Sequence, residues 1–426
     1  MGAEHRAARW VSVLLVLVVL LQRVATPGVP DLSFLVPVVL LWTGFAAAAG
    51  VVRFDRSRLT WWMAAASITA MAMLAQNALV AEAEISITAW GLFMAVWLPF
   101  TVRLRTAGTS GYRLFLTSAT NVLTSLAVVT VAMVGSQLAG LPYRDWFASL
   151  VPQSLQLGGF VITYPISYGS PIYRGNAWIG LEPSMISAQL GLGVLAAILS
   201  GARIWKMVVL LVGLIATVSG SGIAIVVVGL VVVLLSSGRR MLARYSLLGL
   251  ITVAATTLTP FGQLLLDRST ELQSSGSSAS LRALEPYAVL WPAWVENFTG
   301  VLLGYGPGSS QRLVANTNVL GLLVPSPAKV FFEYGIIPGL VLAAFLAISY
   351  IGGPSRAFSL SLFISLWFFQ PGTTTMVIVA PVLLFVTLWS PRVGPPLESQ
   401  RQLDPTGLGL PNADPDPAVS AVVRSA

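Results

Sequence analysis

Two polar segments, at about 141–183 and 263–329, interrupt this otherwise apolar chain and carry the side chains best suited to chemistry. An arginine can bind a diphosphate through paired N–H donors and stays charged at any relevant pH. A carboxylate within hydrogen-bond reach can accept the proton of a reacting hydroxyl group. Together these groups could hold an anionic headgroup at a membrane surface and activate a hydroxyl beside it. The candidate catalytic residues are Arg174 and Glu182 in the first segment and Arg282 and Glu285 in the second.

Each carboxylate also has a purely structural interpretation. Pro183 can occupy a first helical turn, which leaves Glu182 near the N-cap, where free amides and the helix dipole favour a carboxylate. Arg282 and Glu285 are three residues apart and could pair on a short helix. Exposed pairs contribute only about 0–1 kcal/mol, so stability alone gives little reason for this one.

The same segments contain candidates for sugar and phosphate binding. Aromatic rings pack against the C–H faces of sugars, although an interfacial aromatic belt uses the same residue types. The turn at 304–310, GYGPGSS, could present backbone N–H groups as an anion-binding nest, or it could be a tight Gly-Pro turn. No GK[ST] follows it, so it is not a nucleotide-binding P-loop. The candidate substrate-binding residues are Tyr173, Trp178, Tyr305, Arg312 and Lys329, of which the last could instead pair with Glu333 at the membrane interface.

The composition excludes several kinds of chemistry. The chain has no cysteine, and its one histidine, His5, lies in the N-terminal tail, so its body has neither thiol nor imidazole groups. We expect neither a metal nor a cofactor. Hydrophobic residues make up 56% of the chain and charged residues 9%. Because soluble domains carry about 25% charged residues, lipid is expected to surround most of this protein.

Apolar runs of about 17–25 residues are candidate membrane-spanning helices. We expect an all-α polytopic membrane protein with about twelve of them, two of which form a hairpin or a broken pair around the turn at 219–222. The predicted spans lie at about 10–26, 32–52, 60–79, 85–102, 114–140, 184–201, 205–218, 222–238, 245–262, 330–351, 357–371 and 374–390.

The cations fall on alternate loops of this arrangement. Roughly 17 of the 24 Lys and Arg residues lie on one side, which the positive-inside rule makes cytoplasmic. Both termini then lie inside, and both long polar segments lie outside. The net charge of +8 therefore indicates topology and anionic lipid, and no nucleic acid is expected. We expect one membrane-embedded domain at 1–390 and a disordered cytoplasmic tail at 391–426, rich in Pro, Gly, Asp and Ser.

A short amphipathic helix is expected in the second polar segment. Pro286 can begin it at the first helical position, and Pro292 can kink or end it. We expect this helix to lie on the bilayer surface. Its polar face would carry Arg282, Glu285 and Glu296, and its apolar face Leu284, Tyr287, Leu290, Trp291 and Trp294.

The order of these motifs resembles the O-antigen ligase and O-antigen polymerase superfamily. The segment RGNAWIGLEPS at 174–184 is similar to that family's first large outside loop. SLR at 280–282, GYGPGS at 304–309 and FFEYGIIPG at 331–339 are similar to its larger second loop and the helix that follows. The resemblance implies a membrane glycosyltransferase of the GT-C type, which breaks the bond between a glycan and polyprenyl diphosphate without a nucleotide sugar. It also implies that Arg174 and Arg282 hold the diphosphate.

Two departures from the family pattern favour a polymerase over a ligase. Ligases of this family carry a histidine shortly before the E-x-G helix start, where this chain reads VPSPAK at 324–329. Many members also carry an arginine in the turn where this chain reads SGSG at 219–222. We therefore expect an enzyme that joins oligosaccharide repeats outside the cytoplasmic membrane. The alternatives are a ligase, a transporter or flippase of lipid-linked oligosaccharide, and a non-enzymatic scaffold. The expected partners are a polyprenyl-diphosphate-linked oligosaccharide, membrane lipid, and a chain-length regulator or flippase.

Overall fold

The computed structural model describes residues 2–80, 82–167, 169–237, 280–317, 322, 324–370, 372–390 and 397–400. This part of the chain is mostly helical, which confirms the all-α class. The helices are α1 (Ala3–Leu20), α2 (Leu35–Ala48), α3 (Arg56–Leu79), α4 (Ile87–Trp97), α5 (Thr109–Leu138), α6 (Trp146–Leu150), α7 (Pro183–Ser200), α8 (Ile204–Ala216), α9 (Gly220–Ser237), α12 (Ser280–Ala283), α13 (Glu285–Glu296), α14 (Phe298–Leu303), α15 (Ser309–Ala315), α16 (Ser326–Tyr334), α17 (Ile336–Ser349), α18 (Arg356–Ile364), α19 (Met376–Phe385) and α20 (Leu397–Gln400). Short helical turns are η1 (Leu98–Thr101), η2 (Gln153–Leu155), the π-helical η4 (Ser365–Phe369) and η5 (Thr387–Trp389).

Local sequence signals explain several helix ends. The Asp55 side chain accepts a hydrogen bond from the Arg58 amide and caps α3, and Ser355 caps α18 in the same way. At the other end of a helix, Gly201 takes the left-handed conformation (φ 73°) and ends α7. These caps satisfy backbone groups that have no partner within the helix.

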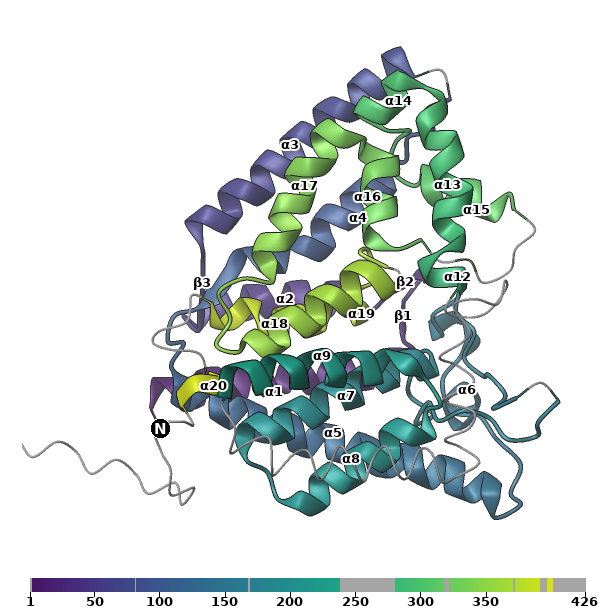
Figure 1. Cartoon of the computed structure of the whole chain (residues 1–426). Helices are drawn as coiled ribbons and strands as arrows, with labels where there is room; N and C mark the ends of the chain where they lie inside the picture. The colour runs from purple at the N-terminus through teal and green to yellow at the C-terminus, as the bar shows by residue number, and fades with distance from the viewer. Residues whose placement is uncertain are drawn as a thin grey trace, which may run out of the picture.

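The helices form one layered body. In Figure 1, α1, α5, α7, α8 and α9 lie together below α2, α18 and α19, and α3, α4, α16 and α17 lie above. Contacts between α18 and α9 join the middle and lower groups. Aromatic side chains fill the space where α5 meets α19: the Tyr112 ring lies 5.2 Å from that of Trp389, and its hydroxyl donates to the Phe385 carbonyl at 3.0 Å.

One end of the body gathers segments that the charge pattern assigned to the cytoplasmic side. Strand β3 (Val52–Phe54) pairs antiparallel with β4 (Val102–Leu104), so Arg53 faces Arg103 across the ladder. The loop before α5 meets the N-terminal segment, where the Glu4 carboxylate accepts from the Gly111 amide at 3.1 Å. Two arginine-bearing loops and the N-terminus therefore share one end, on the left of Figure 1.

The opposite end gathers the polar segments. Strand β1 (Ala25–Thr26) pairs with β2 (Val29–Ser33), and an isolated bridge joins Val24 to Gln156 of the first polar segment. Helices α6, α12, α13 and α15 lie at this same right-hand side of Figure 1. Both polar segments therefore lie at the end opposite the N-terminus.

The helices differ from the predicted spans in length. Only α5 and α7, among the described helices, are both long and apolar enough to cross a membrane by themselves, and seven apolar helices are shorter. The span predicted at 330–351 is two helices, α16 and α17, because Gly335 takes φ 70° between them. The pair predicted around 219–222 is present as α8 and α9. The span predicted at 245–262 lies outside the described residues.

Four residues of the predicted tail have a defined place. Helix α20 packs against α9, and the Glu398 carboxylate accepts from the Ser355 hydroxyl at 2.5 Å and from the Ala357 amide at 3.1 Å. Both Leu397 and Glu398 are buried. Glu398 therefore binds the N-terminus of α18. The rest of the tail lies outside the described residues.

Candidate outer-loop site

The first polar segment reaches α7 through strained backbone. Ala177 (φ 54°) and Trp178 (φ 58°) both take the left-handed region, which non-glycine residues rarely adopt. Next to them, the Gly175 amide donates to the Ala216 carbonyl at 3.0 Å, at the end of α8. A further left-handed residue, Val218 (φ 46°), leads into α9. Strain of this kind costs about 1–3 kcal/mol a residue and concentrates at functional sites.

The N-termini of α7 and α9 are bonded to each other. Ser187 donates to the Ser219 carbonyl at 2.9 Å and accepts from the Gly222 amide at 3.0 Å. Ser221 donates to the Ser184 carbonyl at 2.5 Å. The positive ends of two helix dipoles therefore lie side by side, an arrangement that favours an anion.

Glu182 lies at this junction. It is the N-cap residue of α7, as the sequence predicts, but its side chain makes no cap hydrogen bond. The carboxylate is buried and accepts from the Ser184 hydroxyl at 3.0 Å. A carboxylate at this position can accept a proton from a nearby hydroxyl group.

Arg174 and Tyr173 lie on the strand-like approach to this junction. The Arg174 Nε donates to the Pro165 carbonyl at 3.0 Å, and its guanidinium lies 5.6 Å from the centre of the Tyr164 ring. The Tyr173 backbone exchanges two hydrogen bonds with Gln137 at the end of α5. Arg174 is half-buried, so its charge is held at the edge of the site by two neighbours.

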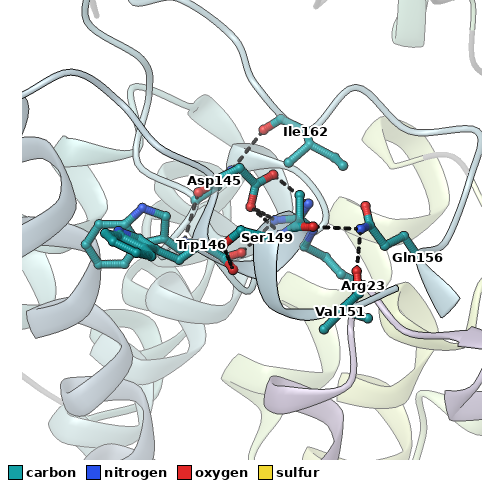
Figure 2. Close-up of polar contacts among 10 residues, drawn as sticks. Arg23, Asp145, Trp146, Ser149, Val151, Gln156 and Ile162 are labelled. Atoms are coloured by element: carbon teal, nitrogen blue, oxygen red, sulfur yellow. Dashed lines mark hydrogen bonds and ion pairs between the residues drawn. The ribbon is translucent and has the colours of Figure 1, made fainter. Parts of the chain in front are cut away.

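Arg23, which the sequence analysis did not single out, anchors the whole segment (Figure 2). Its two terminal nitrogens bind the two oxygens of Asp145 at 2.9 and 2.7 Å, and Nη1 also donates to the Trp178 carbonyl at 2.7 Å. The ring of Phe147 lies 4.5 Å from the guanidinium carbon. Only 1% of the Arg23 side chain is exposed. The one sequence signal was a cation inside the first predicted span, near its C-terminal end.

The pKa of Asp145 reflects this pairing. Partial burial alone would raise the pKa, but the hydrogen bonds from Arg23 and from the Ala148 amide outweigh it and lower the pKa below its ordinary value of 3.8. Asp145 is also the N-cap of α6. The ion pair therefore fixes α6, the strained Trp178 and the outer end of α1 in one place.

The second polar segment approaches the same region through η4. Helix α12 packs against η4, and η4 in turn packs against α9 and α16. Arg282 belongs to α12, but its side chain lies outside the described residues. Glu285 begins α13 and accepts from the Ser280 hydroxyl at 2.9 Å. The helix begins at Glu285 with Pro286 in its first turn, as predicted, and continues through Pro292 to Glu296.

The glycine-rich turn at 304–310 is not an anion-binding nest. Its Tyr305 and Gly306 amides donate to the carbonyls of Phe332 and Glu333, both at 3.0 Å. The Gly304 amide donates to Gly300, and the Ser309 amide donates back to Gly306. Because these amides already have partners, the turn joins 304–306 to the end of α16, and the alternative of a tight turn is the correct one.

Three predicted substrate-binding side chains also have protein partners. Lys329 is buried and binds the equally buried Glu333 at 2.7 Å, and Ser310 donates to the same oxygen at 2.5 Å. Arg312 forms a 2.8 Å ion pair with Glu84. Tyr305 donates its hydroxyl to the Ala293 carbonyl at 2.7 Å and stacks on Phe332. These contacts hold the second segment together. Of the candidates, Arg174, Tyr173, Trp178 and Glu182 lie on the segment that leads into α7.

Comparison with known proteins identifies no relative of this chain. No protein-family model, no curated protein and no solved structure matches this chain. The residues of the site are therefore the basis for its proposed chemistry. They offer a guanidinium, two helix N-termini and a buried carboxylate in one region.

Proposed function

We propose that this chain is a membrane-embedded glycosyltransferase with about twelve transmembrane helices. It joins polyprenyl-diphosphate-linked oligosaccharide repeats into a longer glycan outside the cytoplasmic membrane. The observation that supports this most is the junction of α7 and α9, where two helix N-termini lie beside buried Glu182 and downstream of Arg174. An anionic diphosphate and an acceptor hydroxyl would both find partners there.

The distribution of segments between the two ends agrees with this topology. The arginine-bearing loops meet at the end that holds the N-terminus, as the positive-inside rule requires of a cytoplasmic side. The polar segments lie at the other end. A substrate carried on a lipid could then reach the site laterally, with its diphosphate at the membrane surface.

The proposed reaction is a substitution at the anomeric carbon of the donor glycan. The acceptor hydroxyl oxygen forms a bond to that carbon, and the bond to the diphosphate oxygen breaks with its electron pair. Arg174 and Arg282 stabilise the charge that develops on the diphosphate. Glu182 or Glu285 takes the proton of the acceptor hydroxyl. The products are an extended glycan and free polyprenyl diphosphate.

A transporter is the less supported alternative. Ion-coupled carriers need polar or ionisable groups free to act within their spans. Two of the polar residues best placed for that role have protein partners: Gln189 accepts from Gln22 at 3.0 Å, and Gln137 binds the Tyr173 backbone. These pairs link helix ends and loops, which is a structural role.

The deciding experiment compares glycans after deletion of the gene. Surface and lipid-linked glycans would be separated on gels after rescue with wild type, Arg282→Ala, Arg174→Ala or Arg144→Ala. Arg144 is the matched control, since it is an exposed arginine of the first polar segment that stacks on Trp146. We expect loss of the long ladder, accumulation of single lipid-linked repeats, and rescue only by wild type and Arg144→Ala.

Two other results would change the conclusion. Accumulation of full-length glycan on the lipid carrier in the deletion strain would indicate that the protein is a ligase. An unchanged glycan profile in the deletion strain, with no redundant relative present, would remove the glycosyltransferase proposal and favour a transporter. Full extension with Arg282→Ala would remove that arginine from the diphosphate site.

A further inference from the structure

Helix α13 carries two apolar faces, where the sequence predicted one. Its inner face packs on a small cluster that includes Leu290, Tyr305 and Phe332, with Tyr287 and Trp294 partly buried against it. Leu284 and Trp291, which the sequence assigned to the same face, point away from that cluster and are 54% and 56% exposed. The predicted single face is therefore wrong, because the loop core occupies half of the helix's apolar surface.

The outer face forms a regular stripe. Leu284, Ala288, Trp291 and Val295 recur at helical spacing and are all exposed. Phe298, which is 75% exposed, follows the break at Asn297 and begins α14. No charged residue occurs between 286 and 295. An exposed apolar stripe on a helix whose only charges are Glu285 and Glu296 at its two ends is unusual in water and typical of a membrane interface. The stripe consists of Leu284, Ala288, Trp291, Val295 and Phe298.

This stripe connects to the surface of a helix proposed to span the membrane. The Trp291 ring lies 5.3 Å from Trp294, and Trp294 lies 6.4 Å from Phe331. Phe331 packs closely against Gly339 of α17, whose neighbour Leu340 is 56% exposed. Aromatic rings therefore lead from the stripe to an exposed apolar face of α17 without a charged side chain between them.

The direction of α13 suits the same role. Figure 1 shows α13 running across the direction of α1, α5, α7 and α9, at the end where the polar segments gather. A helix in this orientation would lie in the plane of the membrane when α1, α5, α7 and α9 cross it, although α17 is itself tilted towards the direction of α13. Tryptophan is enriched at that depth, where its ring is partly in hydrocarbon and partly in the headgroup layer.

We propose that the stripe on α13 is a membrane-seating surface that inserts into the lipid of the outer leaflet. It anchors the second polar segment, and with it α12, at a fixed depth beside a lipid-borne substrate. The inference rests on the proposed transmembrane topology, but not on the glycosyltransferase chemistry. The occupant is bilayer lipid because the stripe is uncharged and continuous with the apolar surface of α17.

The absence of cysteine from the chain makes a direct test possible. Single cysteines at Ala288, Trp291 and Val295 would be spin-labelled after reconstitution into vesicles of phosphatidylethanolamine and phosphatidylglycerol. Leu340→Cys on α17 serves as the lipid reference and Ser149→Cys on α6 as the water reference. Collision rates with oxygen and with a water-soluble nickel complex are then compared. We expect the three α13 labels to collide more often with oxygen than with the nickel complex, as the Leu340 label does. The Ser149 label should collide more often with the nickel complex.

Three results would overturn the proposal. Labels on α13 that match Ser149 would put the stripe in water. Immobile labels that exclude both reagents would mean that protein covers it, such as a second copy of this chain. A Leu340 label that prefers nickel would refute the transmembrane topology as well. Gel filtration of each variant before labelling shows whether it is folded, and three independent positions keep the test valid if one is not.

Discussion

Gly304 and Gly335 meet backbone to backbone. A Cβ atom on Gly304 would lie 2.5 Å from the Gly335 nitrogen, and one on Gly335 would lie 2.5 Å from the Gly304 nitrogen. Both residues also have positive φ, of 83° and 70°. This contact joins the glycine-rich turn of the second polar segment to the break between α16 and α17, so the two segments form a single structural joint.

Substituting either glycine should therefore loosen the joint. We expect Gly304→Ala and Gly335→Ala each to lower the free energy of unfolding by about 1–3 kcal/mol. An alanine at either position would have an unfavourable positive φ, and its Cβ would clash with backbone atoms. Thermal unfolding of the detergent-solubilised protein measures the effect. Gly91→Ala in α4 is the control, since a Cβ there meets nothing within 4 Å. Equal stability of all three variants would contradict the close contact.

Removing one member of the Arg23–Asp145 pair should destabilise the outer end of α1 and α6. Removing Arg23 leaves the half-buried carboxylate of Asp145 without its partner, which costs about 1–3 kcal/mol. We expect Arg23→Met to show this loss in chemical denaturation, together with faster proteolysis within 141–183. Arg144→Ala, an exposed arginine of the same segment, should leave both measurements unchanged. Wild-type protease resistance in Arg23→Met would mean that the pair does not hold the segment.

The same pair predicts a defined acid sensitivity. The pKa of folded Asp145 is lowered below 3.8, so the unfolded chain binds a proton at higher pH than the folded one. The resulting stabilisation is fully present above about pH 4–5 and is lost as the pH falls through the folded pKa. Stability of wild type and Asp145→Asn should therefore converge in acid. A constant difference between them down to pH 2 would argue against this linkage.

Lys329 and Glu333 should behave as a coupled pair. Lys329→Met alone leaves a buried carboxylate without its cation, with an expected cost of about 3–5 kcal/mol. The double variant Lys329→Met/Glu333→Leu removes both charges and should recover most of that loss. A double-mutant cycle on unfolding free energies measures the coupling. Additive effects would show that the two charges stabilise the joint independently.

Glu182→Gln tests the proposed proton acceptor. Glutamine keeps the size of the side chain and its bond to Ser184, but it cannot take a proton. We expect extension of a lipid-linked repeat in proteoliposomes to slow by about 10²–10⁴-fold, with unchanged thermal stability. Glu285→Gln is measured in parallel, since that carboxylate is the other candidate. Wild-type rates in both variants would exclude both residues as the base.

Local features of this protein can be predicted from its sequence alone. Apolar runs and composition predicted the helical class, and Pro183 and Pro286 marked the starts of two helices. The break predicted at 219–222 is present, but it lies at 217–219, and 220–222 begin α9. Each of these depends on residues within a few positions of one another, which is the range over which backbone preference and capping act. The candidate motifs were likewise visible as short segments in a fixed order.

The partners of those residues depend on contacts between segments that are distant in sequence. The amides of Tyr305 and Gly306 could have bound an anion or belonged to a tight turn. In the structure they donate to the carbonyls of Phe332 and Glu333. Arg23 pairs with Asp145, which lies more than a hundred residues away in the sequence. Helix α13 buries one apolar face and leaves the other exposed. A hydrophobic side chain is expected to be removed from water. Whether protein or lipid covers it depends on contacts distant in sequence, which no local pattern encodes.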